Sequence, residues 1–223
     1  MSVAKTSING NDYIGAFAVA TDKFAILSKG VPLHKVQLIE EALGVKCVHA
    51  SISGSGLVGL YIAANSNGVL LPGIMYEHEV EEVRKALPGY KVQVLNTNMT
   101  ALRNNILVND KVAIVDPDFS SAEIQIIKDT LGVEVRTGTI GGFRTVGANN
   151  ILTNKGIVLN NRCSDYEKEE MERIVGYKGE QSTANRGSVH IGLCTIANSN
   201  GIVLGEDTTG IEESRIANSL ELL

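Results

Sequence analysis

Hydrophobic and polar positions alternate in blocks that recur about every 44 residues along the chain. The clearest block is a polar turn followed by a short apolar run, and it occurs five times, at spacings of 44, 44, 44 and 45 residues. Two of these turns contain Asn-Gly, which is typical of a two-residue hairpin turn whose central residues both have positive φ. We therefore predict five β-hairpins. Their turns are residues 21–24, 65–68, 109–112, 153–156 and 198–201.

A helix is predicted after each hairpin. Three of the polar connections carry the Ser/Thr-x-x-Glu pattern of a capping box, in which a hydroxyl and a carboxylate satisfy backbone N–H groups at the start of a helix. These pairs are Ser120 with Glu123, Ser164 with Glu167 and Thr209 with Glu212. Apolar residues at helical spacing follow, and breakers at a spacing of 44 residues end the first four helices. The breakers are Gly44, Pro88, Gly132 and Gly176. A strand-like run comes next, so the predicted unit is strand, hairpin, strand, helix, strand.

The repeated unit predicts a ring that is closed by the N-terminus. One such unit cannot bury its own apolar face, so successive units must pack on each other. The fifth unit ends with its helix and lacks the last strand, whereas the N-terminal segment SVAKTSIN (2–9) is strand-like and belongs to no unit. If this segment fills the gap, no sheet edge stays exposed. We expect one domain, 1–223, with a closing strand in 1–10 and repeats of approximately 15–58, 59–102, 103–146, 147–190 and 191–223.

Composition narrows the class of protein. The chain is 43% hydrophobic and has no apolar run of 18 residues, so we expect a soluble, cytoplasmic protein with a real core and no membrane partner. Three cysteines without a CxxC pattern fit a reducing compartment. Aromatic residues make up 4% and the net charge is −5. These values argue against a base-stacking surface, a broad phosphate-binding patch and a DNA partner.

Five short stretches distributed along the chain are specific in combination. They are VHASISG (48–54), VAIVDPDF (112–119), LGVEV (131–135), TANRGS (183–188) and GEDTT (205–209). Together they resemble the translation initiation factor 6 family, and the resemblance runs from Ser2 to the C-terminus. The archaeal members lack the C-terminal tail of their eukaryotic relatives, and this chain also stops at the fifth helix.

The resemblance implies both a fold and a function. The fold is the pentein, a five-bladed β/α-propeller of the mixed α/β class. The family binds the intersubunit face of the large (50S) ribosomal subunit, sterically prevents association with the small subunit, and acts in large-subunit maturation. It has no known catalysis, cofactor or metal. Low aromatic and low basic content suggests that a ribosomal protein is the main contact, with ribosomal RNA peripheral, and we expect a monomer.

The loops that link one unit to the next are the expected ribosome contact, because they emerge at one end of a closed ring. They are rich in Gly, Asn and Arg, and many of their glycines serve backbone geometry. The arginines are the stronger candidates, since a guanidinium offers a planar fork to carboxylates and carbonyls. The predicted contact residues are Ser55, Leu57, Arg103, Asn104, Asn105, Arg144, Asn149, Asn185, Arg186 and His190.

An enzyme is the competing hypothesis, because the pentein fold also hosts Cys-dependent deiminases and amidinotransferases that modify guanidino compounds. Cys194 and His190 are four residues apart and would share a face of a regular strand, as would Cys47 and His49. The middle units carry no His followed by a carboxylate at the family's spacing, so the catalytic groups cannot be assembled. Neither Cys–His spacing is a known zinc pattern, and GSG at 54–56 is too short for a phosphate loop. We expect no catalytic, metal or cofactor site.

Overall fold

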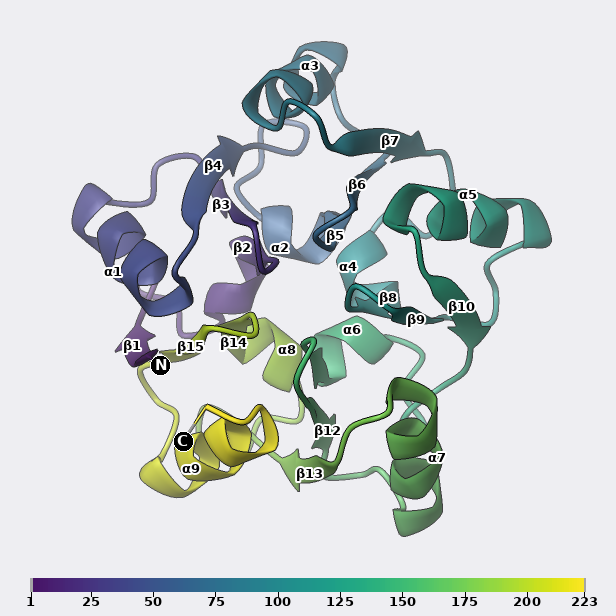
Figure 1. Cartoon of the computed structure of the whole chain (residues 1–223). Helices are drawn as coiled ribbons and strands as arrows, with labels where there is room; N and C mark the ends of the chain where they lie inside the picture. Colours follow the sequence, from purple (N-terminus) through teal and green to yellow (C-terminus); the bar gives the residue numbers. More distant parts are fainter. Residues whose placement is uncertain (1, 223) are drawn as a thin grey trace.

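The computed structural model of the chain describes residues 2–222, and within them lie five three-stranded sheets of the same construction. Each sheet has an antiparallel hairpin whose second strand pairs in parallel with a third strand, and in the first four units this third strand follows a helix. In the first unit these elements are β2 (Ala18–Ala20), β3 (Phe24–Ser28), α1 (Leu33–Leu43) and β4 (Lys46–Ala50). Figure 1 shows the five units arranged around a common centre, with the long helices on the outside.

The other four units repeat this order. The second unit is β5 (Ala63–Ala64), β6 (Gly68–Pro72), α3 (Glu77–Ala86) and β7 (Lys91–Leu95). The third is β8 (Ile106–Val108), β9 (Val112–Val115), α5 (Ser121–Leu131) and β10 (Glu134–Thr137). The fourth is β11 (Ile151–Leu152), β12 (Ile157–Asn160), α7 (Asp165–Val175) and β13 (Gly179–Ser182). The fifth is β14 (Thr195–Ala197), β15 (Gly201–Gly205), α9 (Gly210–Ser219) and, from the N-terminus, β1 (Ser2–Thr6).

The N-terminal strand completes the fifth sheet. β1 pairs in parallel with β15, in a register that places Ser2 opposite Gly201 and Thr6 opposite Gly205. The N-terminal segment therefore supplies the strand that the fifth unit lacks. The three predicted capping boxes are confirmed, since each N-cap hydroxyl and each glutamate makes the expected bond. Among residues 2–222, no helix combines the length and the apolar character that crossing a membrane requires.

Short helices near the centre of the ring are the main element that the sequence analysis missed. They are η1 (Ile14–Ala16), α2 (Val58–Tyr61), α4 (Leu102–Asn105), α6 (Val146–Asn149) and α8 (Ile191–Cys194). Their backbones approach so closely that a Cβ on Gly59 would lie 1.9 Å from the Gly15 carbonyl oxygen. The predicted strand around Cys194 is wrong, because Cys194 ends α8 and His190 is the N-cap of this helix.

The hairpins are confirmed, but their predicted turn type is wrong. Asn67 and Gly68 do not have positive φ. Instead, the Asn65 side-chain oxygen accepts hydrogen bonds from the backbone N–H groups of Asn67 and Gly68, at 3.0 and 3.1 Å. This Asx turn needs no left-handed residue. Glycine is required at 68 for another reason, since a Cβ there would lie 2.3 Å from the carbonyl oxygen of Thr130 in the next unit.

Each hydrophobic core lies between two neighbouring units rather than inside one. In the core that joins the fifth unit to the first, Ile196 and Val203 pack with Leu27 and with Ile39 of α1. The other four cores combine successive units in the same way. A unit therefore has no core of its own, as the repeat analysis anticipates.

Asparagine side chains of the hairpin turns connect neighbouring units. Asn65 Nδ2 donates to the carbonyl oxygens of Asn109 and Leu131, at 3.0 and 2.8 Å. Asn198 Nδ2 makes the equivalent bonds from the fifth unit to Thr21 and Leu43 of the first, both at 2.9 Å. The carbonyls of Leu131 and Leu43 lie at the ends of α5 and α1, so each turn caps the helix of the next unit.

We expect Asn198→Ala and Asn65→Ala to lower the free energy of unfolding by similar amounts, about 1–3 kcal/mol each. Each change removes the donor to one carbonyl of the next turn, one of the two donors to the carbonyl at the helix end, and the acceptor of two turn N–H groups. Asn218→Ala on the exposed face of α9 is the matched control and should change stability by less than about 0.5 kcal/mol. Urea unfolding followed by circular dichroism provides the measurement. A negligible effect of Asn198→Ala beside a large effect of Asn65→Ala would show that the first and last units are not joined as the others are.

Candidate functional site

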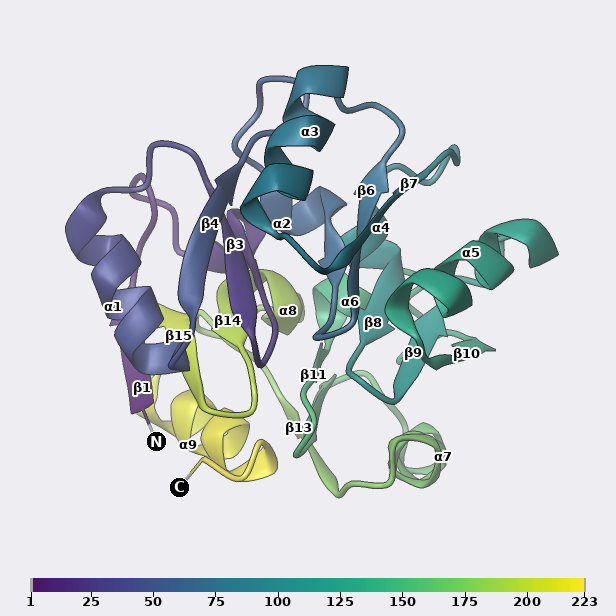
Figure 2. The ribbon, with the colours of Figure 1, turned by 45° about the horizontal axis from the view of Figure 1, so that its top comes forward.

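The loops that lead from one unit to the next lie at the end of the molecule opposite the hairpin turns. The third strand of each sheet runs parallel to the second, so both end away from the turns. Figure 2 shows the turns at the lower side and the short inner helices α2 and α8 above them. We call the opposite end, which carries residues 51–58, 96–102, 139–146 and 183–191 together with the starts of the outer helices, the loop-end surface.

Capping glutamates attach these loops to the neighbouring units. Glu79 is 2% exposed. Its carboxylate accepts hydrogen bonds from the backbone N–H groups of Ser53 and Gly54, at 2.8 and 2.9 Å, and from the Ser51 hydroxyl at 2.7 Å. The same carboxylate accepts from the backbone N–H of Tyr76 at the start of α3. One side chain therefore fixes both a helix start and the loop of the preceding unit.

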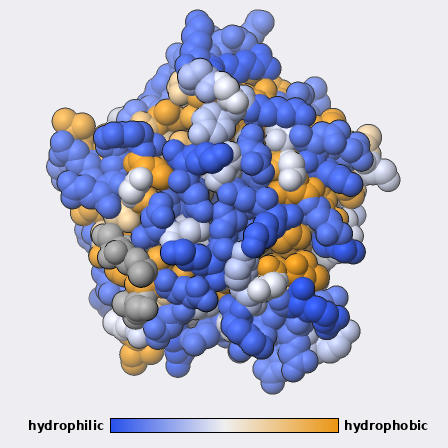
Figure 3. All heavy atoms as spheres, in the orientation of Figure 1, coloured by the Kyte–Doolittle hydropathy of each residue, from blue (hydrophilic) through white to orange (hydrophobic). Residues whose placement is uncertain are grey.

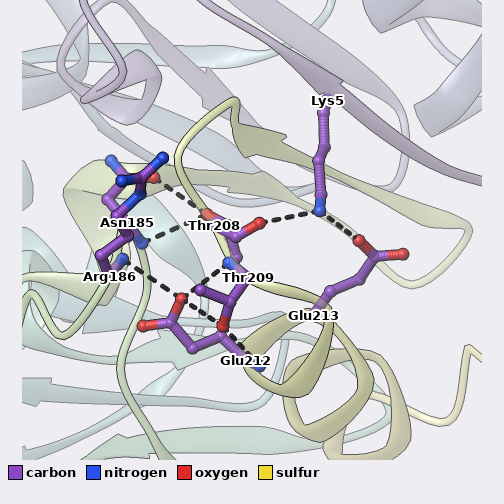
Figure 4. Close-up of polar contacts among 7 residues, drawn as sticks. All are labelled: Lys5, Asn185, Arg186, Thr208, Thr209, Glu212 and Glu213. Carbon is purple, nitrogen blue, oxygen red and sulfur yellow. Dashed lines mark hydrogen bonds and ion pairs between the residues drawn. The ribbon is translucent and has the colours of Figure 1, made fainter.

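Glu212 plays the same part for the loop of the fourth unit (Figure 4). It accepts from the backbone N–H groups of Arg186 and Gly187, at 3.2 and 2.8 Å, and caps α9 together with Thr209. The N-terminal strand β1 contacts the start of α9 as well. Its Lys5 donates to the carbonyl of Thr208 at 2.8 Å and pairs with Glu213 at 2.6 Å.

The first unit departs from this arrangement. Glutamate occupies the equivalent position in the other four units, and Lys35 occupies it here. Lys35 Nζ donates to the carbonyl of Ser7, the residue that follows the closing strand. The loop after β1 is therefore held by a lysine that donates to a backbone carbonyl. The loops bound by Glu79 and Glu212 are held by a carboxylate that accepts from backbone N–H groups.

Two predicted contact arginines lie on the loop-end surface. The side chain of Arg186 is 74% exposed and pairs with Asp207 at 3.1 Å. Arg186 has φ of 60°, a left-handed conformation that Glu212 stabilises through the backbone N–H. Arg144 is held more firmly, because its Nη2 lies 2.8 Å from Asp116 Oδ1 and it also pairs with Asp118.

His190 is an exposed residue whose ring is oriented by Asn149. Asn149 is fully buried, and its Nδ2 lies 3.0 Å from His190 Nδ1. The amide oxygen of Asn149 accepts a bond from the Thr145 hydroxyl at 2.8 Å, which leaves Nδ2 as the donor. The edge of the Phe143 ring packs on the imidazole, with 6.3 Å between centroids. Asn149 therefore supports His190 and is not itself accessible.

The remaining predicted contacts are engaged in bonds within the protein or are partly buried. Asn185 Nδ2 donates to the Asp12 carbonyl at 2.8 Å, and Asn105 Nδ2 donates to the Ala101 carbonyl at 3.0 Å. The Ser55 hydroxyl accepts from the backbone N–H of Leu57 at 3.3 Å. Asn104 is partly buried. Arg103 lies elsewhere, since it lines the central cavity of the ring and its Nη1 donates to the Gly147 carbonyl at 2.5 Å.

Exposed apolar side chains are the feature of this surface that the sequence analysis missed. The large apolar residues exposed within residues 2–222 all lie at the loop end, in the loops or at the starts of helices. They are Tyr13, Leu33, Ile74, Tyr76, Tyr166 and Ile211. A signal existed in the sequence, because Tyr166 and Ile211 each lie two residues after an N-cap residue, in the first turn, and fall outside the apolar stripe of their helices. The opposite face is mostly hydrophilic around its centre (Figure 3).

The cysteines are free, and burial affects each of them. Desolvation raises the pKa of Cys47 and of Cys194 to about 12, and that of Cys163 to about 11. A thiol in such surroundings stays protonated at neutral pH and is a poor nucleophile. The two Cys–His pairs belong to different units. Cys47 and His49 lie on β4 of the first unit, and His190 and Cys194 lie at α8 of the fifth.

The capping glutamates give stability a pH dependence whose sign follows from their surroundings. Burial alone raises the pKa of Glu79 and of Glu212, but the hydrogen bonds that each accepts outweigh it and hold the pKa below the ordinary value of 4.5. A group whose pKa is depressed by folding adds stability above its unfolded pKa, and the protein loses this stability as pH falls through the folded value.

We expect the free energy of unfolding to fall as pH drops below about 4.5, and to fall less steeply in Glu212→Gln. The variant should also be less stable at pH 7, because an amide cannot accept all the N–H bonds that the carboxylate accepts. Urea titrations at pH 7, 5, 4 and 3 measure both effects, with exposed Glu206→Gln as the control. Parallel pH profiles for Glu212→Gln and the parent protein would contradict the assignment.

Comparisons with known proteins agree with this geometry and give the family. A family model described as the eIF-6 family matches residues 3–219. A Pyrococcus abyssi protein named translation initiation factor 6 is 37% identical, and the match covers 100% of both chains. Proteins of the same name from Saccharolobus islandicus and Methanocaldococcus jannaschii are 38% and 36% identical over 99% of both chains. These relatives are named as initiation factors and not as enzymes. The chain belongs to the eIF-6 family of translation initiation factors.

Proposed function

We propose that this translation initiation factor binds the intersubunit face of the large (50S) ribosomal subunit and prevents association with the small subunit by occupying the space between them. The observation that carries the proposal is that side chains join neighbouring units at both ends, such as Asn65 and Asn198 at the turns and Glu79 and Glu212 at the loops. Together with the family membership, they support a closed five-bladed β/α-propeller of the pentein type. A stiff body of this kind obstructs without needing moving parts.

We propose the loop-end surface as the face that docks. It combines exposed arginine with exposed apolar and aromatic side chains, the residue types that anchor protein–protein contacts. Arg186 and Tyr166 are the two most exposed examples. The partner is chiefly a ribosomal protein, since the net charge of −5 does not suit an extended phosphate surface.

The ten contact residues predicted from the sequence remain proposals of unequal standing. Arg144, Arg186 and His190 present polar groups that a partner can reach. Asn149, Asn185 and Asn105 are more suited to positioning neighbours, because their amides are engaged within the protein. Large-subunit maturation, monomeric state and a cytoplasmic location accompany the proposal as consequences of the same family role.

We expect Arg186→Glu to weaken binding to large subunits by about tenfold or more, because the change reverses the charge of an exposed, preorganised contact. Co-sedimentation of the protein with purified large subunits gives the affinity, and a subunit-joining assay gives the functional effect. The matched control is Arg173→Glu, an exposed arginine near the end of α7 at the turn side.

The subunit-joining assay with the parent protein tests the proposed function directly. Subunits that join normally at saturating protein would contradict a role in blocking association. Equal loss of binding in Arg186→Glu and Arg173→Glu would remove the loop-end surface as the specific docking face, although binding itself would stand.

The alternative function is the guanidino-modifying enzyme, and it requires a reactive thiol. We expect Cys194 to resist iodoacetamide at pH 7 in the native protein and to react readily once the protein is unfolded, because burial raises its pKa to about 12. Mass spectrometry after timed labelling provides the measurement. Fast labelling of native Cys194 together with turnover of a guanidino compound would favour the enzyme.

A further inference from the structure

One position in the short inner helices breaks the five-fold repeat. Glycine occupies it in four units, as Gly15, Gly59, Gly147 and Gly192, and the third unit carries Arg103 instead. The glycines are needed for close approach, since a Cβ on Gly147 would lie 2.0 Å from the Arg103 carbonyl oxygen and one on Gly192 would lie 2.2 Å from that of Gly147. Close backbone packing therefore explains the four glycines but does not explain the arginine.

The side chain of Arg103 enters the centre of the ring. It lines a cavity of about 30 Å³ whose other walls are the inner strands β2, β5, β8, β11 and β14. Most of these walls are apolar, among them Ala18, Ala64, Leu107 and Ile151. Desolvation lowers the pKa of Arg103 to about 10, so the guanidinium is still charged at neutral pH.

This charge is not balanced within the part of the chain that the structure describes. The guanidinium has five N–H donors, and one described bond uses Nη1, to the Gly147 carbonyl. Thr195 lines the same cavity and is 4% exposed, and its hydroxyl oxygen has no hydrogen-bond partner among residues 2–222. Buried polar groups without partners are costly, and so is a partly buried charge that makes few hydrogen bonds.

Two carboxylates described near the ring axis are already engaged. Asp22 and Asp110 lie at the turn-end mouth of the centre, where both accept a bond from Asn154 Nδ2, at 2.8 and 2.7 Å. Each also accepts a backbone N–H of a neighbouring turn, from Ser199 and Ser66 respectively, both at 2.8 Å. These aspartates hold the turns together and form no ion pair with Arg103.

We propose that the central cavity binds one small monovalent anion, chloride under ordinary conditions, between the Arg103 guanidinium and the Thr195 hydroxyl. By the same measure a cavity needs about 10–15 Å³ to hold a water-sized particle, so about 30 Å³ admits a halide. The apolar walls suit an ion of low charge that gives up its hydration water readily. The proposal concerns the stability of the ring and does not depend on ribosome binding.

The first test compares chloride with gluconate, an anion too large for the cavity, at constant ionic strength. We expect the midpoint of thermal unfolding to rise saturably with sodium chloride, and at ten times the dissociation constant the unfolding equilibrium should be about 11-fold less favourable. Arg103→Met should abolish this chloride-specific shift. Arg186→Met removes an exposed arginine and should retain it.

The second test uses the parent protein and needs no variant. Crystals grown in sodium bromide should show an anomalous peak within hydrogen-bonding distance of both Arg103 and Thr195. Thr195→Val removes the hydroxyl but keeps the charge of Arg103, so it should weaken the halide effect several-fold. This variant provides the test if Arg103→Met fails to fold. Identical unfolding in chloride and gluconate, or a cavity that contains water alone in bromide, would overturn the proposal.

Discussion

A single 44-residue unit cannot bury both faces of its sheet, and this constraint governs the structure. Every hydrophobic core is shared by two units, so the joints between units decide whether the chain folds at all. At the turn end, Asn65 and Asn198 cap the helix of the next unit. At the loop end, Glu79 and Glu212 bind the loop of the preceding unit. Each unit is thus held at both ends by side chains whose partners are mostly backbone groups.

The architecture could be predicted from the sequence because its elements repeat. Because turn, capping box and breaker recur at one spacing, the order of elements and the partner of the N-terminal strand could be inferred before any coordinates. The inner helices could not, since a four-residue helix such as α2 contains one turn and gives no periodic signal. In the hairpin turns, by contrast, a sequence motif was present but predicted the wrong backbone conformation. Asn67-Gly68 matches the motif for positive φ, but Gly68 is needed to admit the carbonyl of Thr130 from another unit.

The candidate site was predicted only in outline, for the same reason. Loop position identified Arg144, Arg186 and His190, which do present polar groups on one surface. Loop position could not distinguish Arg103, whose side chain turns into the centre because of the helix that carries it. Nor could it separate a contacting asparagine from a positioning one such as Asn149, whose burial depends on the neighbouring unit. Side-chain direction in short irregular segments is set by tertiary packing, which no local pattern encodes.

We infer that the five units, because they share their cores, unfold as one cooperative body. Native-state hydrogen exchange tests it most directly, because it reports the free energy of opening for each strand separately. If the N-terminal strand is joined as firmly as the others, amides of β1 and of β10 should exchange with the same free energy, equal to that of global unfolding. Exchange of β1 at a distinctly lower free energy than β10 would contradict the account.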